Sequence, residues 1–155
     1  MREKKWDQAM AKVDEAESVL PTEQKKNMDA VRFNVMLGKK DYAAAYQFAT
    51  RMSDSHMDDA TLQNELAWRI ATDSGIEKRD LELAEKFAER ANAASKVKEP
   101  GIIDTLARVK WLRGKKEEAM ALQETAVGLA DDSTVKGNLQ KALDSYKRGE
   151  LPKFN

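Results

Sequence analysis

The sequence predicts an all-α protein, and two observations support that prediction. Ala, Leu, Glu, Lys and Arg together make up about half of the 155 residues, a composition typical of long helices and helical repeats. Apolar residues recur at steps of three and four along most of the chain, and no segment alternates apolar and polar residues as a half-buried strand does. We therefore expect about eight helices joined by short turns.

The first two helices are expected over residues 3–20 and 22–38. Residues 3–20 carry one apolar stripe and end before Pro21, because proline disfavours the helical conformation of the residue that precedes it. Thr22 is the expected N-cap of the second helix. Gly38 is expected to end that helix, since glycine accepts the left-handed conformation that often follows a helix.

The third helix begins near Asp41, and polar residues 53–59 interrupt the apolar pattern after it. Asp58 or Asp59 then caps a fourth helix, since an aspartate oxygen can accept a hydrogen bond from an unpaired backbone N–H of the first turn. Residues 72–80 are polar and contain a glycine, so they are expected to form a loop.

The last four helices follow the same logic. The fifth covers residues 81–91, and a sixth begins at Pro100, which is compatible with a first helical turn. The sixth ends at Gly114, and the seventh and eighth cover residues 119–129 and 135–146.

Alternate helices can be aligned on one alanine each, which indicates an internal repeat. The aligned residues are Ala9, Ala44, Ala84 and Ala119, with spacings of 35, 40 and 35 residues. The long loop 72–80 explains the longer middle spacing. Small residues recur four and seven positions further on, where they let one helix press closely on its neighbour, although Arg51 and Gln123 depart from that pattern.

This pattern resembles the tetratricopeptide repeat, whose unit is a pair of antiparallel helices. The best match is residues 100–133, with the pair Leu106-Ala107, the turn residue Gly114, and Ala119 and Ala126 in the second helix. The resemblance implies a right-handed α-α superhelix in a single domain, residues 1–155. Its expected parts are a half repeat at about 3–21, repeats at about 22–55, 58–95 and 100–133, and a capping helix at about 134–148.

A second likeness covers roughly residues 6–154. It rests on the order and spacing of the stretches at residues 39–44, 64–70, 79–84, 104–109 and 123–127. Together these stretches are similar to the C-terminal helical-repeat region of some bacterial thioredoxin-like (redoxin) proteins. The likeness implies a larger parent protein, periplasmic or exported, whose redox cysteines lie outside this chain.

Composition excludes several classes of function. The 27 basic and 27 acidic residues leave no net charge, whereas nucleic-acid and anionic-membrane binders need a basic excess. The chain has no cysteine, which excludes disulfides, thiolate zinc sites and cysteine nucleophiles from it. No apolar run is long enough to cross a bilayer. The basic residues at the start of the sequence are not followed by the apolar stretch of a signal peptide, so none is expected. We therefore expect no nucleic-acid partner and no membrane insertion.

No constellation of catalytic or metal-binding residues stands out. His56 and the aspartates around it lie in a polar turn and match no metal-ligand spacing, so no metal or other cofactor is expected. The pairs Glu117-Glu118 and Asp131-Asp132 lie at a helix start and in a turn, where acids offset the helix dipole or face solvent. A hydrolase that uses carboxylates is the weakest of the hypotheses.

A groove lined by the first helix of each repeat is the better candidate for a binding site. Tryptophan and arginine are enriched at binding hot spots, because they offer a large amphipathic surface and a planar donor group. Trp68 and Trp111 can equally be core residues, since a tryptophan buries a large area wherever it lies. The groove mapping comprises Met28, Arg32, Met36, Asn64, Trp68, Asp104, Arg108 and Trp111.

The expected function is therefore protein–protein interaction or scaffolding without catalysis. The partner is a protein, a peptide or an adjoining thioredoxin-like domain. The alternative is a structural or dimerisation domain that supports a thiol-disulfide oxidoreductase whose catalytic domain lies outside this chain.

Overall fold

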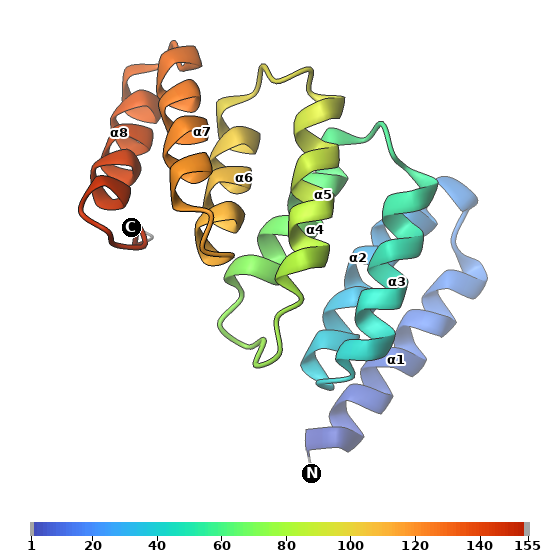
Figure 1. Ribbon diagram of the computed structural model, residues 1–155. Coiled ribbons are helices and arrows are strands. Elements are labelled where there is room, and N and C mark those ends of the chain that lie inside the picture. Colours follow the sequence, from blue (N-terminus) through green and yellow to red (C-terminus); the bar gives the residue numbers. More distant parts are fainter. Residues whose placement is uncertain (1, 154–155) are drawn as a thin grey trace. The chain divides into compact units, whose positions relative to one another are not determined.

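The computed structural model describes the backbone of residues 2–153, and the side chains of residues 5–21 and 28–153. These residues form eight helices and no strand, so the all-α prediction is confirmed (Figure 1). The helices are α1 (Arg2–Val19), α2 (Thr22–Gly38), α3 (Tyr42–Ser55), α4 (Ala60–Thr72), α5 (Leu81–Ala94), α6 (Pro100–Leu112), α7 (Lys116–Leu129) and α8 (Ser133–Lys147).

The chain divides into two compact units. The first contains the residues up to 55 together with 74–78, and the second contains 56–73 and the residues from 79 onward. In the first unit α2 packs against α1 and α3. In the second unit each helix from α4 to α8 packs against the next one along the chain, and α4 also contacts α6. This packing of sequence neighbours is compatible with a helical repeat.

Aspartates cap four of the helices, and Asp41 does so at α3, where its carboxylate accepts from the backbone N–H of Ala44 at 3.2 Å. Asp59 accepts a hydrogen bond from the backbone N–H of Leu62, which confirms one of the two expected caps of α4. Asp80 and Asp132 have the same role at α5 and α8. The prediction for α2 was wrong, since Thr22 is the first helical residue and Pro21 holds the N-cap position. A proline can take that position because it lacks only a backbone N–H, and the N–H groups at the start of a helix have no partner within the helix.

Gly38 ends α2 as expected, but for a different reason. Its backbone is not left-handed, and the residue with positive φ in this turn is Lys40, at 62°. A Cβ atom on Gly38 would collide with the ring of Trp6 on α1. Glycine is therefore required here for the close approach of α1 to α2. At the end of α6, by contrast, Gly114 has a φ of 80° and is the expected left-handed turn residue.

Helix α3 corrects the repeat alignment by one residue. The side chains that it buries are Ala45, Ala49 and Met52, together with Ser53, whereas Ala44 is half-buried and Arg51 is exposed. The i, i+4, i+7 spacing is the one found in α5 and α7, where the buried residues are Ala84, Ala88 and Ala91, and Ala119, Gln123 and Ala126. The apparent departure at Arg51 therefore disappears with the correct register.

The long loop between α4 and α5 packs on α3. Ile76 is buried, the hydroxyl of Tyr42 accepts a hydrogen bond from the backbone N–H of Glu77 at 3.0 Å, and the hydroxyl of Tyr46 donates to the carbonyl of Lys78 at 2.6 Å. The additional residues of loop 72–80 thus have a structural role within the first unit.

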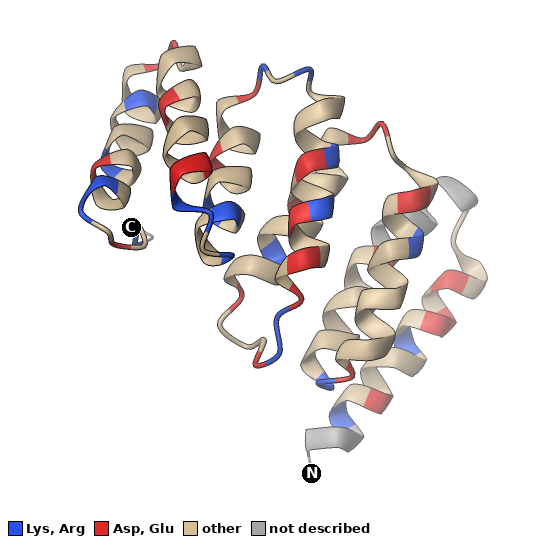
Figure 2. Ribbon diagram, in the orientation of Figure 1, with Lys and Arg blue, Asp and Glu red and all other residues tan. Residues whose placement is uncertain are grey.

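Charged residues of both signs are spread over the helices rather than gathered by sign (Figure 2). Within the described residues, no helix is long and apolar enough to cross a membrane.

Candidate functional site

The structure distributes the predicted groove residues over both units. Met28, Arg32 and Met36 lie on α2 of the first unit. The other residues lie on α4 and α6 of the second unit, which are packed against each other: Asn64, Trp68, Asp104, Arg108 and Trp111.

In the first unit, the donor groups of Arg32 are directed at α1. Its guanidinium contacts the carboxylates of Asp14 at 2.6 Å and Glu17 at 2.7 Å, and the sulfur of Met10 at 3.3 Å. The hydrogen bond that Arg32 donates to Glu17 is the main reason that the pKa of Arg32 is raised. Within the described residues, Arg32 therefore links α1 to α2.

Trp111 belongs to the core of the second unit. It is only 8 % exposed, and its ring lies 4.6 Å from the ring of Tyr146 on α8. Ala107 and Ala119 complete this cluster, so the indole joins α6, α7 and α8. This placement corresponds to the core alternative for this tryptophan.

Trp68 and Arg108 form the central contact of the candidate site. Trp68 is half-buried on α4, and the guanidinium carbon of Arg108 lies 5.6 Å from the centre of its ring, within range for a cation–π interaction. Arg108 is 6 % exposed, and burial lowers its pKa. Its Nη2 donates to the backbone carbonyl of Pro152 at 2.9 Å. One arginine thus connects α4, α6 and the chain that follows α8.

Asp104 lies one turn before Arg108 and is held by Gln123. The Gln123 amide donates to the Asp104 carboxylate at 2.8 Å and to the carbonyl of Leu139 at 3.1 Å, so it bridges α6, α7 and α8. Burial raises the pKa of Asp104, while the Gln123 hydrogen bond and the charge of Arg108 act in the opposite direction. The glutamine that departed from the repeat pattern is therefore a buried connector.

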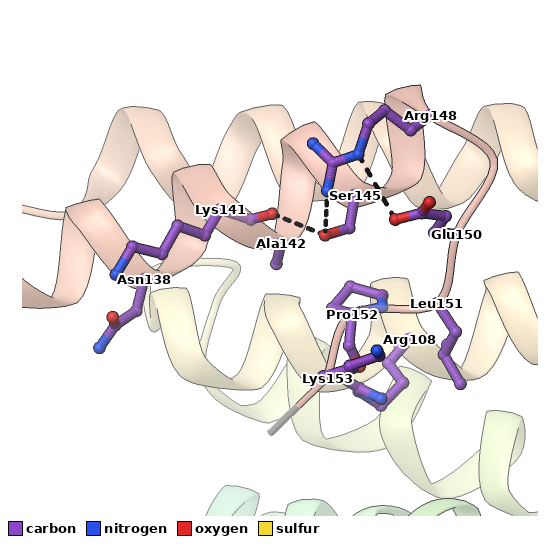
Figure 3. Close-up of a pocket in the computed structure, with 10 residues that line it drawn as sticks. All are labelled: Arg108, Asn138, Lys141, Ala142, Ser145, Arg148, Glu150, Leu151, Pro152 and Lys153. Atoms are coloured by element: carbon purple, nitrogen blue, oxygen red, sulfur yellow. Dashed lines mark hydrogen bonds and ion pairs between the residues drawn. The ribbon is translucent and has the colours of Figure 1, made fainter. Parts of the chain in front are cut away.

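A pocket of about 750 Å³ lies beside this cluster, between α8 and residues 149–153 (Figure 3). We call it the α8 pocket. Four of its lining residues are basic and one is acidic. They are Arg108, Asn138, Lys141, Ala142, Ser145, Arg148, Glu150, Leu151, Pro152 and Lys153.

Sequence reasoning found Arg108 but missed the rest of the α8 pocket. It treated α8 only as a capping helix, although Lys141 and Arg148 are spaced by seven residues and so lie on one face of it. No sequence signal identifies Pro152, because its contact with Arg108 joins residues 44 positions apart.

A separate charge cluster joins α5 and α6 near a smaller pocket of about 410 Å³. Its centre is Glu85, which is 4 % exposed and is bonded by Lys110 at 2.5 Å, by Lys115 at 2.7 Å and by Arg113. The carboxylate is surrounded by three cations, so the arrangement is that of an ion-pair network between helices.

The remaining candidates lie outside the α8 pocket. His56 lies in the turn after α3, where its carbonyl accepts a hydrogen bond from the Gln63 side chain at 2.9 Å. Glu117 and Glu118 are exposed in the first turn of α7, and the carboxylate of Glu118 lies 3.2 Å from Nζ of Lys110, a member of the charge cluster around Glu85. Over the residues that the structure describes, no group of three or more His, Asp or Glu side chains is placed to hold a metal ion.

The fold therefore defines an all-helical chain of neighbouring helices with a polar pocket at one end of the second unit. Comparisons with protein-family models, with curated protein sequences and with solved structures each found no match. The tetratricopeptide and thioredoxin-like resemblances consequently remain predictions from the sequence.

Proposed function

We propose that this chain is a non-catalytic protein–protein interaction module of the tetratricopeptide-like type. Its binding surface is the face of the second unit formed by α4, α6 and α8. In repeats of this type the first helix of each pair lines the binding groove, and α4 and α6 are the first helices of the repeats expected at about 58–95 and 100–133.

The observation that carries this proposal is the arrangement around Arg108. The side chain lies over the ring of Trp68 and at the same time donates to a backbone carbonyl of residues 151–153, a segment that is in neither a helix nor a strand. An aromatic ring beside a planar donor is the combination that dominates binding hot spots. The adjoining α8 pocket supplies the concave surface that a peptide needs.

The proposal extends to the parent protein on the sequence resemblance alone. We propose that the module follows a thioredoxin-like domain in a larger chain. A Cys-x-x-Cys motif encoded upstream in the same reading frame supports this relation, and an upstream region that encodes no such motif contradicts it.

The binding function can be tested with peptides selected against the purified chain from a random displayed library. We expect peptides whose binding, measured by fluorescence anisotropy, weakens about 30-fold in Trp68→Ala, the loss typical of a hot-spot aromatic.

Phe48→Ala is the matched control, because Phe48 is also half-buried under an arginine, with Arg51 at 5.6 Å from its ring, but lies on α3 of the first unit. Failure to select any peptide, or equal binding by the two variants, contradicts the proposal.

A further inference from the structure

Residues 149–153 contact the second unit in the way that a bound peptide would. The backbone of residues 151–153 is in neither a helix nor a strand. Pro152 is buried against Arg108, whereas its neighbour Leu151 is 41 % exposed (Figure 3). A buried hydrogen bond joins the Pro152 carbonyl to the guanidinium of Arg108.

The same segment places an acidic side chain in the α8 pocket. Nε of Arg148 donates to the carboxylate of Glu150 at 3.4 Å, and Nη2 of the same arginine donates to the hydroxyl of Ser145 at 3.2 Å (Figure 3). The sequence Glu-Leu-Pro thus offers the pocket one carboxylate, one exposed apolar side chain and one backbone carbonyl.

The pocket has more positive charge than this segment neutralises. Lys141 of α8 lines it and, within the described part of the chain, makes no ion pair, while the segment itself carries one acidic residue, Glu150, and one basic residue, Lys153. Without residues 149–153 the lining retains Arg108, Lys141 and Arg148 and contains no acidic side chain. An anionic, extended chain is the ligand that complements such a surface.

We propose that the α8 pocket binds an extended acidic segment of a partner protein, with carboxylates on Lys141 and Arg148 and a backbone carbonyl on Arg108. Residues 149–153 occupy the pocket with one such carboxylate, that of Glu150, and one such carbonyl, that of Pro152, and are displaced by the partner. This inference rests on the proposed binding function and specifies the ligand class of that surface.

The test uses a labelled synthetic peptide with repeated Glu-Leu-Pro units and a matched peptide with Gln in place of Glu. A chain that lacks residues 149–155 is expected to bind the acidic peptide about ten-fold more tightly than the full chain does, and the Gln peptide no better than the full chain does. Lys141→Glu, made in the chain that lacks residues 149–155, is expected to abolish this ten-fold gain in affinity for the acidic peptide. Its matched control is Lys136→Glu, which changes an exposed lysine of the same helix outside the pocket.

A second variant guards against misfolding of the shortened chain. Replacement of Leu151 and Pro152 by glycine in the full chain removes the buried proline ring. Like the deletion of residues 149–155, it is expected to increase the affinity for the acidic peptide. Equal affinity of both altered chains and the full chain, or equal binding of the Glu and Gln peptides, overturns the inference. The proposed function has its own test and fails when no library-selected peptide binds Trp68→Ala more weakly than it binds the unaltered chain.

Discussion

The ion-pair network around Glu85 gives the sharpest prediction about stability. Burial by itself would raise the pKa of the Glu85 carboxyl. Hydrogen bonds from Lys110, Lys115 and Arg113 outweigh that effect and lower the pKa from 4.5 to about 2. The carboxylate form is therefore stabilised in the folded chain relative to the unfolded chain.

The sign and size of the effect follow from this pKa. A group whose pKa is lower in the folded state contributes its stability above the unfolded-state value, and that contribution is lost as the pH falls from 4.5 towards 2. At 1.36 kcal/mol for each pKa unit, the contribution at neutral pH is about 3 kcal/mol. Glu85→Gln removes the charge and should lower the free energy of unfolding by about that amount.

The assay is urea denaturation followed by circular dichroism at several pH values. We expect Glu85→Gln to be less stable than the unaltered chain at pH 7, with a difference that narrows below pH 4.5. Glu65→Gln is the control, because Glu65 is an exposed glutamate in α4 of the same unit. A difference that is constant with pH, or no larger than that of the control, would refute this account of the network.

Three further predictions concern local geometry and can be read from thermal or urea denaturation. Gly38→Ala should destabilise the chain because the new Cβ meets the ring of Trp6, whereas Gly128→Ala, in open space within α7, should stabilise it by about 0.5–1 kcal/mol. Val97→Gly should raise stability by about 1 kcal/mol, since the β-branched Val97 has a φ of 57°. Gln123→Leu should cost about 1–3 kcal/mol, because it leaves the half-buried carboxylate of Asp104 without the amide that donates to it.

The positions of the helices could be predicted because they depend on local signals. Apolar residues at steps of three and four mark the buried face of each helix, and Asp59 and Gly114 mark a beginning and an end. The register of α3 could not be predicted as safely. Residues 43–45 are all alanine, so the sequence alone does not decide which one faces the neighbouring helix.

The candidate site was predicted only in part, because its contacts are not local. Trp68 and Arg108 were identified by residue type and helix position, and the structure brings them together. Trp111 has the same residue type as Trp68 but is enclosed by Tyr146, a contact that depends on how α8 packs. The role of Pro152 depends on the path of the chain after α8, which no periodic pattern records.

The most direct test of the binding face is a nuclear magnetic resonance titration of the indole N–H signals. The three tryptophans give one signal each, and they lie in different surroundings: Trp6 on α1, Trp68 on the proposed face and Trp111 in the core. On addition of a selected peptide, the signal of Trp68 should shift while that of Trp6 stays in place. A shift of the Trp6 signal with that of Trp68 unchanged would contradict the proposed face.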